Sequence, residues 1–326
     1  MSPVRVILAR SVDELEKLRP LWERLAHETA PTIFQTFEWN RLAAEIFCRR
    51  LSPAVCAVES EGGAAIIPAA VNLQRTRLEL LGETLFDYRD VLHAGDLETL
   101  KIAWGMLAKF NLSLSVTSVE PEAAATRWAD LRPIEYARAP WVDASETTAE
   151  EFRALHTRAA RQLRRMERRG ARLRQYPGTE QHPVRRLYQL KTEQFAGDAN
   201  NVFRDERRRE FMIAMAAKEG NNCQLFTLED DAGCMIAGLV TFLDHNIRRF
   251  YTIYFDPGWA GYSPGVVLVF AATAISIEQG LSCDYMTGEY PYKLRFANAS
   301  RMLYRIEASP SQIAALAQEQ AERKIA

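Results

Sequence analysis

Cysteine is scarce in this sequence, and its spacing argues against a metal site. The five cysteines are an odd number, spread among apolar neighbours at Cys48, Cys56, Cys223, Cys234 and Cys283. No two of them, and no Cys/His pair, have the spacing of a zinc finger, so we expect no bound metal. We expect buried, reduced thiols in a cytoplasmic protein.

Long hydrophobic runs are also missing. No uninterrupted apolar stretch approaches the roughly 20 residues that a membrane span needs, and the apolar helix expected over residues 266–277 is too short. Residues 1–10 carry arginines within a short apolar run and no small-residue cleavage site, so we expect no secretory signal.

An excess of charge of one sign is absent as well. The chain has 41 Lys and Arg against 42 Asp and Glu, a net charge of -1, which gives no reason to expect wholesale binding to nucleic acid. Its 48% apolar and 25% charged residues are typical of a globular protein. A length of 326 residues suits two domains or a duplicated unit.

The hydrophobic pattern of residues 1–145 predicts one α/β half. A strand over 4–9 precedes two helices, the first beginning at Ser11 with the spacing of a capping box and the second at Phe34. An antiparallel meander over 54–81 follows. We expect a mixed, mostly antiparallel sheet flanked by helices.

Residues 146–326 repeat this order, so we place the domain boundary at their start. A long helix over 148–170 and two further helices precede three strands over 223–255. An apolar helix over 264–279 and a strand over 283–286 complete the second half.

The turn before that apolar helix has the composition of an anion site. It reads Gly261-Tyr262-Ser263-Pro264-Gly265. Ser263 fits the N-cap and Pro264 the first helical position, where a missing N–H costs nothing. Gly265 has no side chain to block a ligand.

The free N–H groups of Gly265, Val266 and Val267 would then face whatever lies beyond the end of the preceding strand. These groups and the positive end of the helix dipole favour a phosphate or pyrophosphate, and Lys293 could add a full positive charge. A plain helix start without a ligand accounts for the same pattern.

A second polar segment follows the first meander. It holds Asp87, Tyr88, Arg89, Asp90 and His93, which could supply a general base for an incoming amine or alcohol. The alternative is a polar loop in which Asp90 pairs with Arg89 or with a helix end.

The helix expected over 148–170 carries a positive face. Arg158, Arg161, Arg165, Arg168 and Arg172 follow one another at steps of three or four residues. Three interpretations stay open: a solvated face paired to acidic neighbours, a surface for an anionic partner such as a polysaccharide, nucleotide or RNA, and a contribution to the phosphates of a cofactor.

Several of these segments together resemble a known family. Its C-terminal signature is matched by Tyr-Ser-Pro-Gly at 262–265, Glu-Gln-Gly at 278–280, Cys-Asp-Tyr-Met-Thr-Gly-Glu at 283–289 and Tyr-Lys-Leu-Arg-Phe at 292–296. Residues 34–39 and 81–90 are similar to its other landmarks. The chain thus resembles the CelD/BcsL-type acetyltransferases of cellulose biosynthesis, which belong to the GNAT (Gcn5-related N-acetyltransferase) superfamily.

The resemblance implies two tandem GNAT-like halves, 1–145 and 146–326, with an acyl-CoA site in the second. The phosphates of acetyl-CoA, the acyl donor, would be cradled by Tyr262, Ser263, Pro264, Gly265 and Val266. The backbone over 254–256 would receive the pantetheine arm. The glycine-rich Gln/Arg-x-x-Gly-x-Gly/Ala loop of other GNAT proteins is absent from this sequence.

The resemblance also suggests catalytic residues. Lys293 with Tyr292 is similar to an aromatic-Lys pair of the Fem-type twin-GNAT transferases, which use aminoacyl-tRNA. Glu289 could act as a base or as a partner for Lys293, Asp87 as a base, and Tyr290 or Tyr292 could protonate a leaving thiolate.

The resemblance therefore implies an acyltransferase that moves an acetyl or related group to an amine or hydroxyl acceptor, such as a small molecule or saccharide. Two alternatives stay open: a Fem-type transferase that uses aminoacyl-tRNA, and an inactive GNAT fold that serves as a binding subunit in polysaccharide synthesis.

Overall fold

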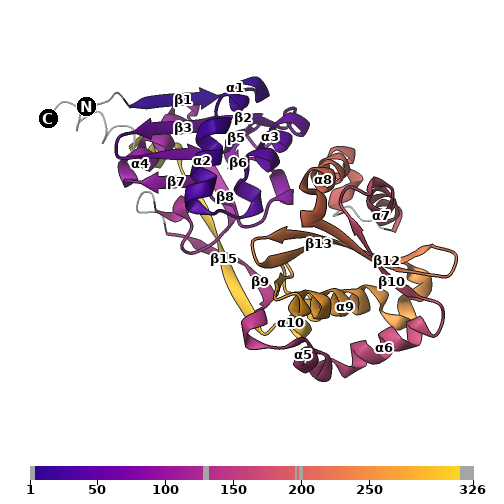
Figure 1. Ribbon diagram of the computed structural model, residues 1–326. Coiled ribbons are helices and arrows are strands. Elements are labelled where there is room, and N and C mark those ends of the chain that lie inside the picture. Colours follow the sequence, from indigo (N-terminus) through magenta and orange to yellow (C-terminus); the bar gives the residue numbers. More distant parts are fainter. Residues whose placement is uncertain (1–3, 128–131, 195–196, 198–200, 316–326) are drawn as a thin grey trace. The chain divides into compact units, whose positions relative to one another are not determined.

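The chain folds into two compact units, Met1–Ala137 with Met302–Ala326 (unit 1) and Arg138–Arg301 (unit 2). The computed structural model in Figure 1 describes residues 4–127, 132–194, 197 and 201–315. The division falls before the expected boundary at 145/146, and the C-terminal segment returns to unit 1 because its last strand, β15 (Ala299–Ala308), pairs with β8 (Leu114–Val119). The predicted α/β class is confirmed: each unit has mixed, mostly antiparallel strands and flanking helices.

Unit 1 contains two sheets. One has the order β1-β3-β4-β7 and is antiparallel; in the other, β2, β5, β6, β8 and β15 follow one another, with β6 and β8 parallel. The further strands of unit 1 are β1 (Arg5–Ala9), β2 (Leu51–Pro53), β3 (Val55–Ser60), β4 (Gly63–Ile67), β5 (Ala69–Asn72), β6 (Arg77–Leu80) and β7 (Leu92–Gly95). Its α-helices are α1 (Val12–Glu16), α2 (Arg19–Thr29), α3 (Phe37–Ile46) and α4 (Leu97–Gly105).

Local sequence signals set several of these elements. Ser11 caps α1 by accepting a hydrogen bond from the Glu14 N–H at 3.2 Å, as the capping-box spacing predicts. The predicted single helix from Ser11 is wrong, because the chain starts a new helix, α2, that takes Pro20 in its first turn. Trp39 is fully buried and packs edge to face against Phe34, so it belongs to the core of unit 1.

Unit 2 is a six-stranded arrangement in the order β10-β11-β12-β13-β14-β9. The first four strands are antiparallel, β14 is parallel to β13, and β9 is antiparallel to β14. The strands are β9 (Ile134–Val142), β10 (Arg172–Pro177), β11 (Cys223–Glu229), β12 (Met235–Asp244), β13 (Ile247–Phe255) and β14 (Ser282–Asp284). The α-helices are α5 (Ala149–Leu155), α6 (Thr157–Glu167), α7 (Gln181–Gln194), α8 (Glu206–Glu219), α9 (Pro264–Glu278) and α10 (Pro291–Phe296).

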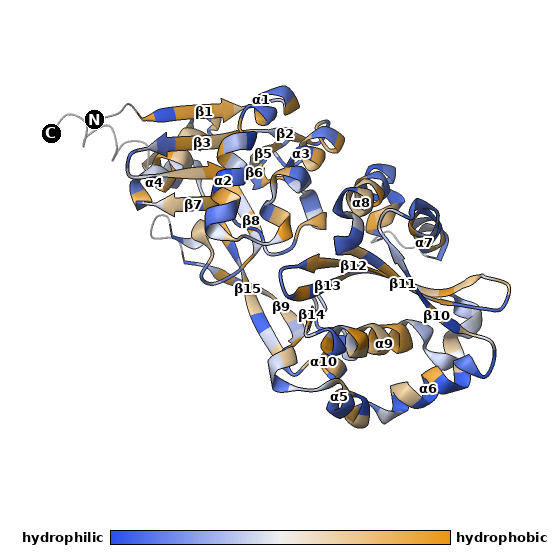
Figure 2. Ribbon diagram, viewed as in Figure 1, coloured by the Kyte–Doolittle hydropathy of each residue, from blue (hydrophilic) through white to orange (hydrophobic). Residues whose placement is uncertain are grey.

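Helix α9 is the central helix of unit 2. Twelve of its fifteen residues are buried, and Figure 2 shows it apolar along its length. It contacts β11, β12, β13 and β14, and also α5 and α6. A helix enclosed on two sides needs apolar side chains all round, which explains why its sequence lacks a polar face. No helix in the described part of the chain is both long and apolar enough to cross a membrane.

Strands β13 and β14 are joined over a short length and then separate. They pair only from Ile247 to Arg249 with Ser282 to Asp284. At this point the buried Arg249 donates to Asp244 and to Asp284, with both N···O distances at 2.6 Å. Beyond Arg249 the edge of β13 that faces away from β12 has no further pairing with β14.

Two other expectations need correction. The long helix expected over 148–170 is two helices, α5 and α6, because the backbone leaves helical geometry at His156 (φ -108°, ψ 42°). The five cysteines are reduced, but only Cys56, Cys223 and Cys283 are buried; Cys48 and Cys234 lie exposed in the turns after α3 and before β12. Burial raises the pKa of each of the three buried thiols to about 12.

Candidate functional site

A cavity of about 350 Å³ opens at the start of α9 within unit 2. Four segments line it: α6, the 3₁₀ turn η8 (Pro257–Tyr262), the first turn of α9, and α10. The lining residues are Arg158, Ala159, Gln162, Gly261, Tyr262, Ser263, Val266, Val267, Pro291, Tyr292 and Arg295. Of the residues that the sequence predicts for the site, Tyr262, Ser263, Val266 and Tyr292 are thus brought together around one cavity.

The first turn of α9 presents two bare amides. Pro264 occupies the first helical position as predicted, and the Val267 N–H already donates to the Ser263 carbonyl at 3.0 Å. The N–H groups of Gly265 and Val266 have no acceptor among the residues that the structure describes. Two amides, rather than the expected three, are therefore available for an anion at the positive end of the helix.

Ser263 does not cap the helix with its side chain, contrary to expectation. It stands at the N-cap position with a left-handed backbone (φ 53°, ψ 55°), and its hydroxyl makes no capping hydrogen bond. An N-cap serine bonds the helix amides from an extended backbone, so this conformation turns the hydroxyl away from them. The exposed Ser263 lines the cavity instead.

Gly265 serves the packing of α9 rather than the approach of a ligand. A Cβ at this position would lie 3.3 Å from Ile253 Cδ1 and 3.4 Å from Phe255 Cδ1, both on β13. The hydrogen in place of a side chain therefore faces the sheet and lets the helix start pack closely on it. This corrects the expectation that the glycine keeps open the path of a ligand.

Replacing Gly265 with valine is expected to lower the free energy of unfolding by about 1–3 kcal/mol, because the added methyl groups overpack the contact with β13. Urea unfolding of the two proteins measures the difference. Gly261→Ala is the matched control, since an added Cβ meets nothing within 4 Å there, and it should change stability by less than about 0.5 kcal/mol. Equal stability of Gly265→Val and the parent protein would contradict the packing role.

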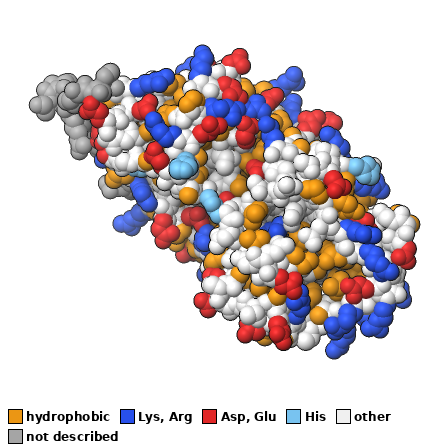
Figure 3. Space-filling model, viewed as in Figure 1, with side chains coloured by type: hydrophobic (Ala, Val, Ile, Leu, Met, Phe, Trp, Pro, Cys, Tyr) orange, Lys and Arg blue, Asp and Glu red, His pale blue; other side chains and the backbone are white. Residues whose placement is uncertain are grey.

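Arginines surround this helix start. Arg158 on α6 and Arg295 on α10 line the cavity, and the described lining residues include no Asp or Glu. The guanidinium groups of Arg165 and Arg169 lie 5.5 and 5.2 Å from the centre of the Tyr262 ring. Figure 3 shows Lys and Arg side chains gathered over α6. The arginine-rich segment therefore borders the cavity, and its charge suits a phosphate group there.

Tyr292 lines this cavity with a half-buried side chain that ends in a hydroxyl group. Burial, with a smaller effect of the neighbouring Tyr290, raises the pKa of Tyr292 to about 12. Its ring stacks against Tyr290 with centroids 6.3 Å apart and planes 21° apart. The phenol therefore keeps its proton at neutral pH and can donate it, whereas Tyr290 is 61% exposed.

Lys293 and Glu289 lie close in sequence to the cavity but do not line it. Lys293 is buried, and its Nζ donates to the carbonyls of Thr287 at 2.6 Å and Met286 at 3.3 Å. These bonds hold the turn that precedes α10. Glu289 is exposed and lies 3.9 Å from Arg138, an ion pair that water screens.

The segment with Asp87 belongs to unit 1. Asp87 is half-buried, and its neighbour Asp90 accepts hydrogen bonds from the N–H groups of Ala124 and Ala125 at 3.1 and 2.7 Å. Asp90 thus holds a helix end, one of the two alternatives in the expected polar loop. Burial raises the pKa of Asp90 to about 6.

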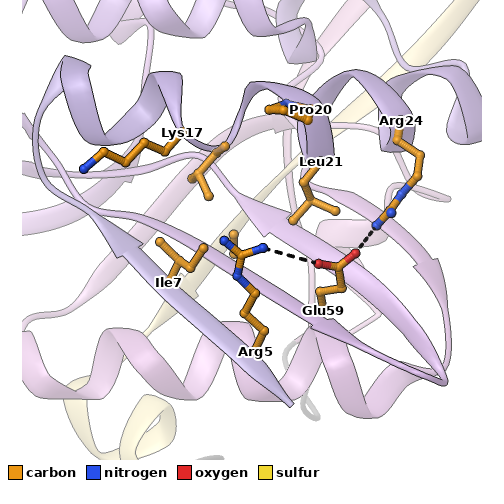
Figure 4. Close-up of a pocket in the computed structure, with 9 residues that line it drawn as sticks. Arg5, Ile7, Lys17, Pro20, Leu21, Arg24 and Glu59 are labelled. Atoms are coloured by element: carbon orange, nitrogen blue, oxygen red, sulfur yellow. Dashed lines mark hydrogen bonds and ion pairs between the residues drawn. The ribbon is translucent and has the colours of Figure 1, made fainter. Parts of the chain in front are cut away.

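Another hollow lies in unit 1, between β1, β3 and the first two helices (Figure 4). Its volume is about 400 Å³. Figure 4 shows Arg5 and Arg24 directed at Glu59, at 4.0 and 2.5 Å. Unlike the cavity at α9, this hollow therefore contains a carboxylate, Glu59, which pairs with both arginines. Across the described residues, no group of three His, Cys, Asp or Glu side chains is placed to hold a metal ion.

The sequence of unit 2 matches a known family over most of its length. Residues 153–294, which include every residue that lines the cavity except Arg295, match the family described as Acetyltransferase (GNAT) domain. The two bare amides at the start of α9, together with Arg158, Arg165 and Arg169 beside them, therefore lie inside the matched residues.

The whole chain is similar in fold to solved structures of tandem GNAT and Fem proteins. A tandem GNAT protein from the clavulanic acid biosynthesis pathway matches with a TM-score of 0.51 at 12% identity, over 94% of this chain and 99% of that one. FemX matches with a TM-score of 0.53 at 10% identity, over 84% and 91%. L-PGS from Bacillus licheniformis matches with a TM-score of 0.56 at 13% identity, over 91% and 95%. These matches confirm the predicted tandem GNAT fold. A comparison with curated protein sequences found no match to the chain.

Sequence reasoning missed Arg295 and underrated Arg158. Arg295 follows Tyr292 by three residues, so helical spacing places both on one face of α10, and that signal could have found it. Arg158 was predicted only as part of the positive face of a helix. The fold shows that this end of α6 borders the start of α9.

Proposed function

We propose that the protein is an acyltransferase that moves an acetyl or related acyl group from acyl-CoA to an amine or hydroxyl acceptor. The observation that carries this proposal is the cavity at the start of α9, where two bare amides and two arginines meet, within or directly beside the residues that match the GNAT acetyltransferase domain. Backbone amides at a helix start and guanidinium groups are the donors that phosphates bind best.

The donor set fits the pyrophosphate end of CoA. The N–H groups of Gly265 and Val266 would bind phosphate oxygens, and Arg158 and Arg295 would neutralise their charge. The bound thioester supplies an activated carbonyl carbon. Tyr292, which keeps its proton, would donate it to the departing sulfur.

The other predicted site residues stay predictions. Lys293, Glu289 and Asp87 are not among the residues that line this cavity. Lys293 would act through the turn that it holds at Met286 and Thr287, which sets the position of α10 and therefore of Tyr292.

The acceptor rests on the CelD-type resemblance of residues 262–296, which favours a sugar or polysaccharide precursor. The assay is release of free thiol from acetyl-CoA, with and without amino sugars as acceptors. Release that depends on the acceptor supports the proposal. Binding of CoA without any release would instead favour an inactive GNAT fold that serves as a binding subunit.

Removing the arginines of the cavity is expected to weaken CoA binding. Arg295→Met and Arg158→Met should each raise the Kd for CoA roughly tenfold, which corresponds to about 1.4 kcal/mol for a charge-assisted hydrogen bond at an exposed position. Titration calorimetry measures the Kd values. Arg161→Met is the matched control, because Arg161 lies on the same helix, is exposed and does not line the cavity. An equal loss in all three variants would show that only the overall charge matters.

One observation favours a second candidate, a transferase that takes its acyl group from aminoacyl-tRNA. Helix α6 borders the cavity, and Arg165 on this helix and Arg169 just after its end lie over the Tyr262 ring, as expected if the phosphates of a larger anionic carrier continued along this segment. Such binding would weaken steeply as salt rises, because each phosphate contact releases counterions. Transfer from aminoacyl-tRNA with this salt dependence, and none from acetyl-CoA, would establish the second candidate.

A further inference from the structure

Cross-strand neighbours build the hollow between β1, β3 and the first two helices of unit 1 (Figure 4). Arg5 and Ile7 on β1 stand opposite Glu59 and Ala57 on β3, and alternate residues of a strand share one face. Ala57 is the smallest side chain of this group, so space remains above it. That space, about 400 Å³, falls in the range of small-molecule sites, roughly 300–1,000 Å³.

The bottom of this hollow is apolar. It is lined by Ile7, Leu18, Leu21 and Ala57, and the side chains of Leu18 and Ala57 are each only 1% exposed. A ligand with an apolar body would remove these side chains from contact with water. Such contact stabilises the bound state in proportion to the apolar area that it covers.

Three cations and one carboxylate surround this apolar surface: Arg5, Lys17, Arg24 and Glu59. Figure 4 shows Lys17 and Arg24 at opposite ends of the hollow, with Arg5 between them. Arg24 donates a hydrogen bond to Glu59 at 2.5 Å, whereas the Arg5 guanidinium is 4.0 Å from Glu59, which is too long for one. Within the part of the chain that the structure describes, the side chains of Arg5 and Lys17 therefore have no hydrogen-bond acceptor.

The charges of the hollow favour an anion over a cation. Arg5 presents a planar guanidinium that matches the two oxygens of a carboxylate, and Lys17 adds an ammonium. Glu59 carries the opposite charge, but its hydrogen bond to Arg24 already compensates that charge. The hollow therefore combines an apolar surface with two cations whose donors have no acceptor among the described residues.

We propose that this hollow is a binding site for a small organic anion, a molecule with an apolar body that ends in a carboxylate. The apolar body lies on Ile7, Leu18 and Leu21. The carboxylate accepts hydrogen bonds from Arg5 and Lys17. Unit 1 then has a ligand site of its own, and the inference does not rest on the proposed acyl transfer, because every residue that lines the hollow belongs to unit 1.

Methyl NMR of the whole chain, with octanoate as the probe, tests the site. The methyl resonances of Ile7 and Leu21 are expected to shift along a saturable curve with a Kd on the order of 1 mM. Acetate, which lacks the apolar body, and octylamine, which is a cation at neutral pH, should leave these resonances unchanged. Equal shifts with octylamine, or none at roughly ten times that concentration of octanoate, overturn the proposal.

Two substitutions are expected to change the Kd for octanoate in opposite directions. Arg5→Met removes a donor and should raise it about fivefold, whereas Glu59→Gln removes a like charge and should lower it about threefold. If Arg5→Met does not fold, Lys17→Met replaces it, with the same expected loss. Arg49→Met is the matched control, because Arg49 is an exposed arginine of unit 1 that does not line the hollow, and it should bind as wild type. An unchanged Kd in Arg5→Met, or weaker binding in Glu59→Gln, overturns the proposal.

Discussion

Replacing Arg249 with methionine is expected to lower the free energy of unfolding by about 3–5 kcal/mol. Arg249 bonds Asp244 and Asp284 at 2.6 Å each, and all three side chains are buried. Its removal leaves two buried carboxylates without the guanidinium that they share; His245, 3.8 Å from Asp244, offers a counter-charge only when it is protonated. The loss includes the junction of β13 and β14, because Arg249 and Asp284 pair in that short ladder.

Urea unfolding, monitored by far-UV circular dichroism, measures this difference. Arg153→Met is the matched control within unit 2: Arg153 pairs with Glu278 at the same 2.6 Å, but both side chains are nearly half exposed. Water already screens that pair, so its loss should cost less than about 1 kcal/mol. Similar losses in the two variants would contradict the role given to burial.

Replacing Tyr292 with phenylalanine is expected to lower the turnover of acetyl-CoA by at least roughly 100-fold, while the Kd for CoA stays within about twofold. The substitution removes one hydroxyl and keeps the ring that stacks on Tyr290. The loss should therefore fall on kcat, because proton donation to sulfur occurs only in the reaction. Stopped assays of thiol release, combined with calorimetry, separate the two quantities.

The pH dependence gives a second check on Tyr292. Its pKa is raised to about 12, so the phenol stays protonated as the pH rises through 8, 9 and 10. Ionisation of Tyr292 should therefore cause no fall in activity below about pH 10. Tyr290→Phe is the control, because Tyr290 is exposed and does not line the cavity. If Tyr290→Phe lost most of its turnover and Tyr292→Phe stayed fully active, the proton donor would be Tyr290 and not Tyr292.

Much of the fold of unit 2 was predictable from its sequence. The three strands predicted over 223–255 are β11, β12 and β13; β11 begins and β13 ends at those bounds, and α9 ends one residue before its predicted end. These elements are bounded by strong local signals, such as the Asp-Asp-Ala-Gly turn before β12. The break between α5 and α6 carries no proline or glycine, so the pattern of residues 148–170 could not reveal it.

The site was predictable where it depends on one stretch of chain. Tyr262, Ser263, Val266 and Tyr292 do line one cavity, and the amides of Gly265 and Val266 have no acceptor in the part of the chain that the structure describes. The role of Gly265 was misjudged, because a sequence shows that a side chain is missing but not which neighbour faces the gap.

The central claim is that the first amides of α9 bind the phosphates of an acyl carrier, and amide NMR tests it most directly. In spectra of 15N-labelled protein titrated with CoA, the resonances of Gly265 and Val266 are expected to move downfield as their N–H groups begin to donate. The Val267 resonance should move much less, because its N–H already donates to the Ser263 carbonyl. The claim would be contradicted if the amide resonances of Gly265 and Val266 did not shift when the protein is saturated with CoA. It would also be contradicted if no resonance of the protein shifted at millimolar CoA.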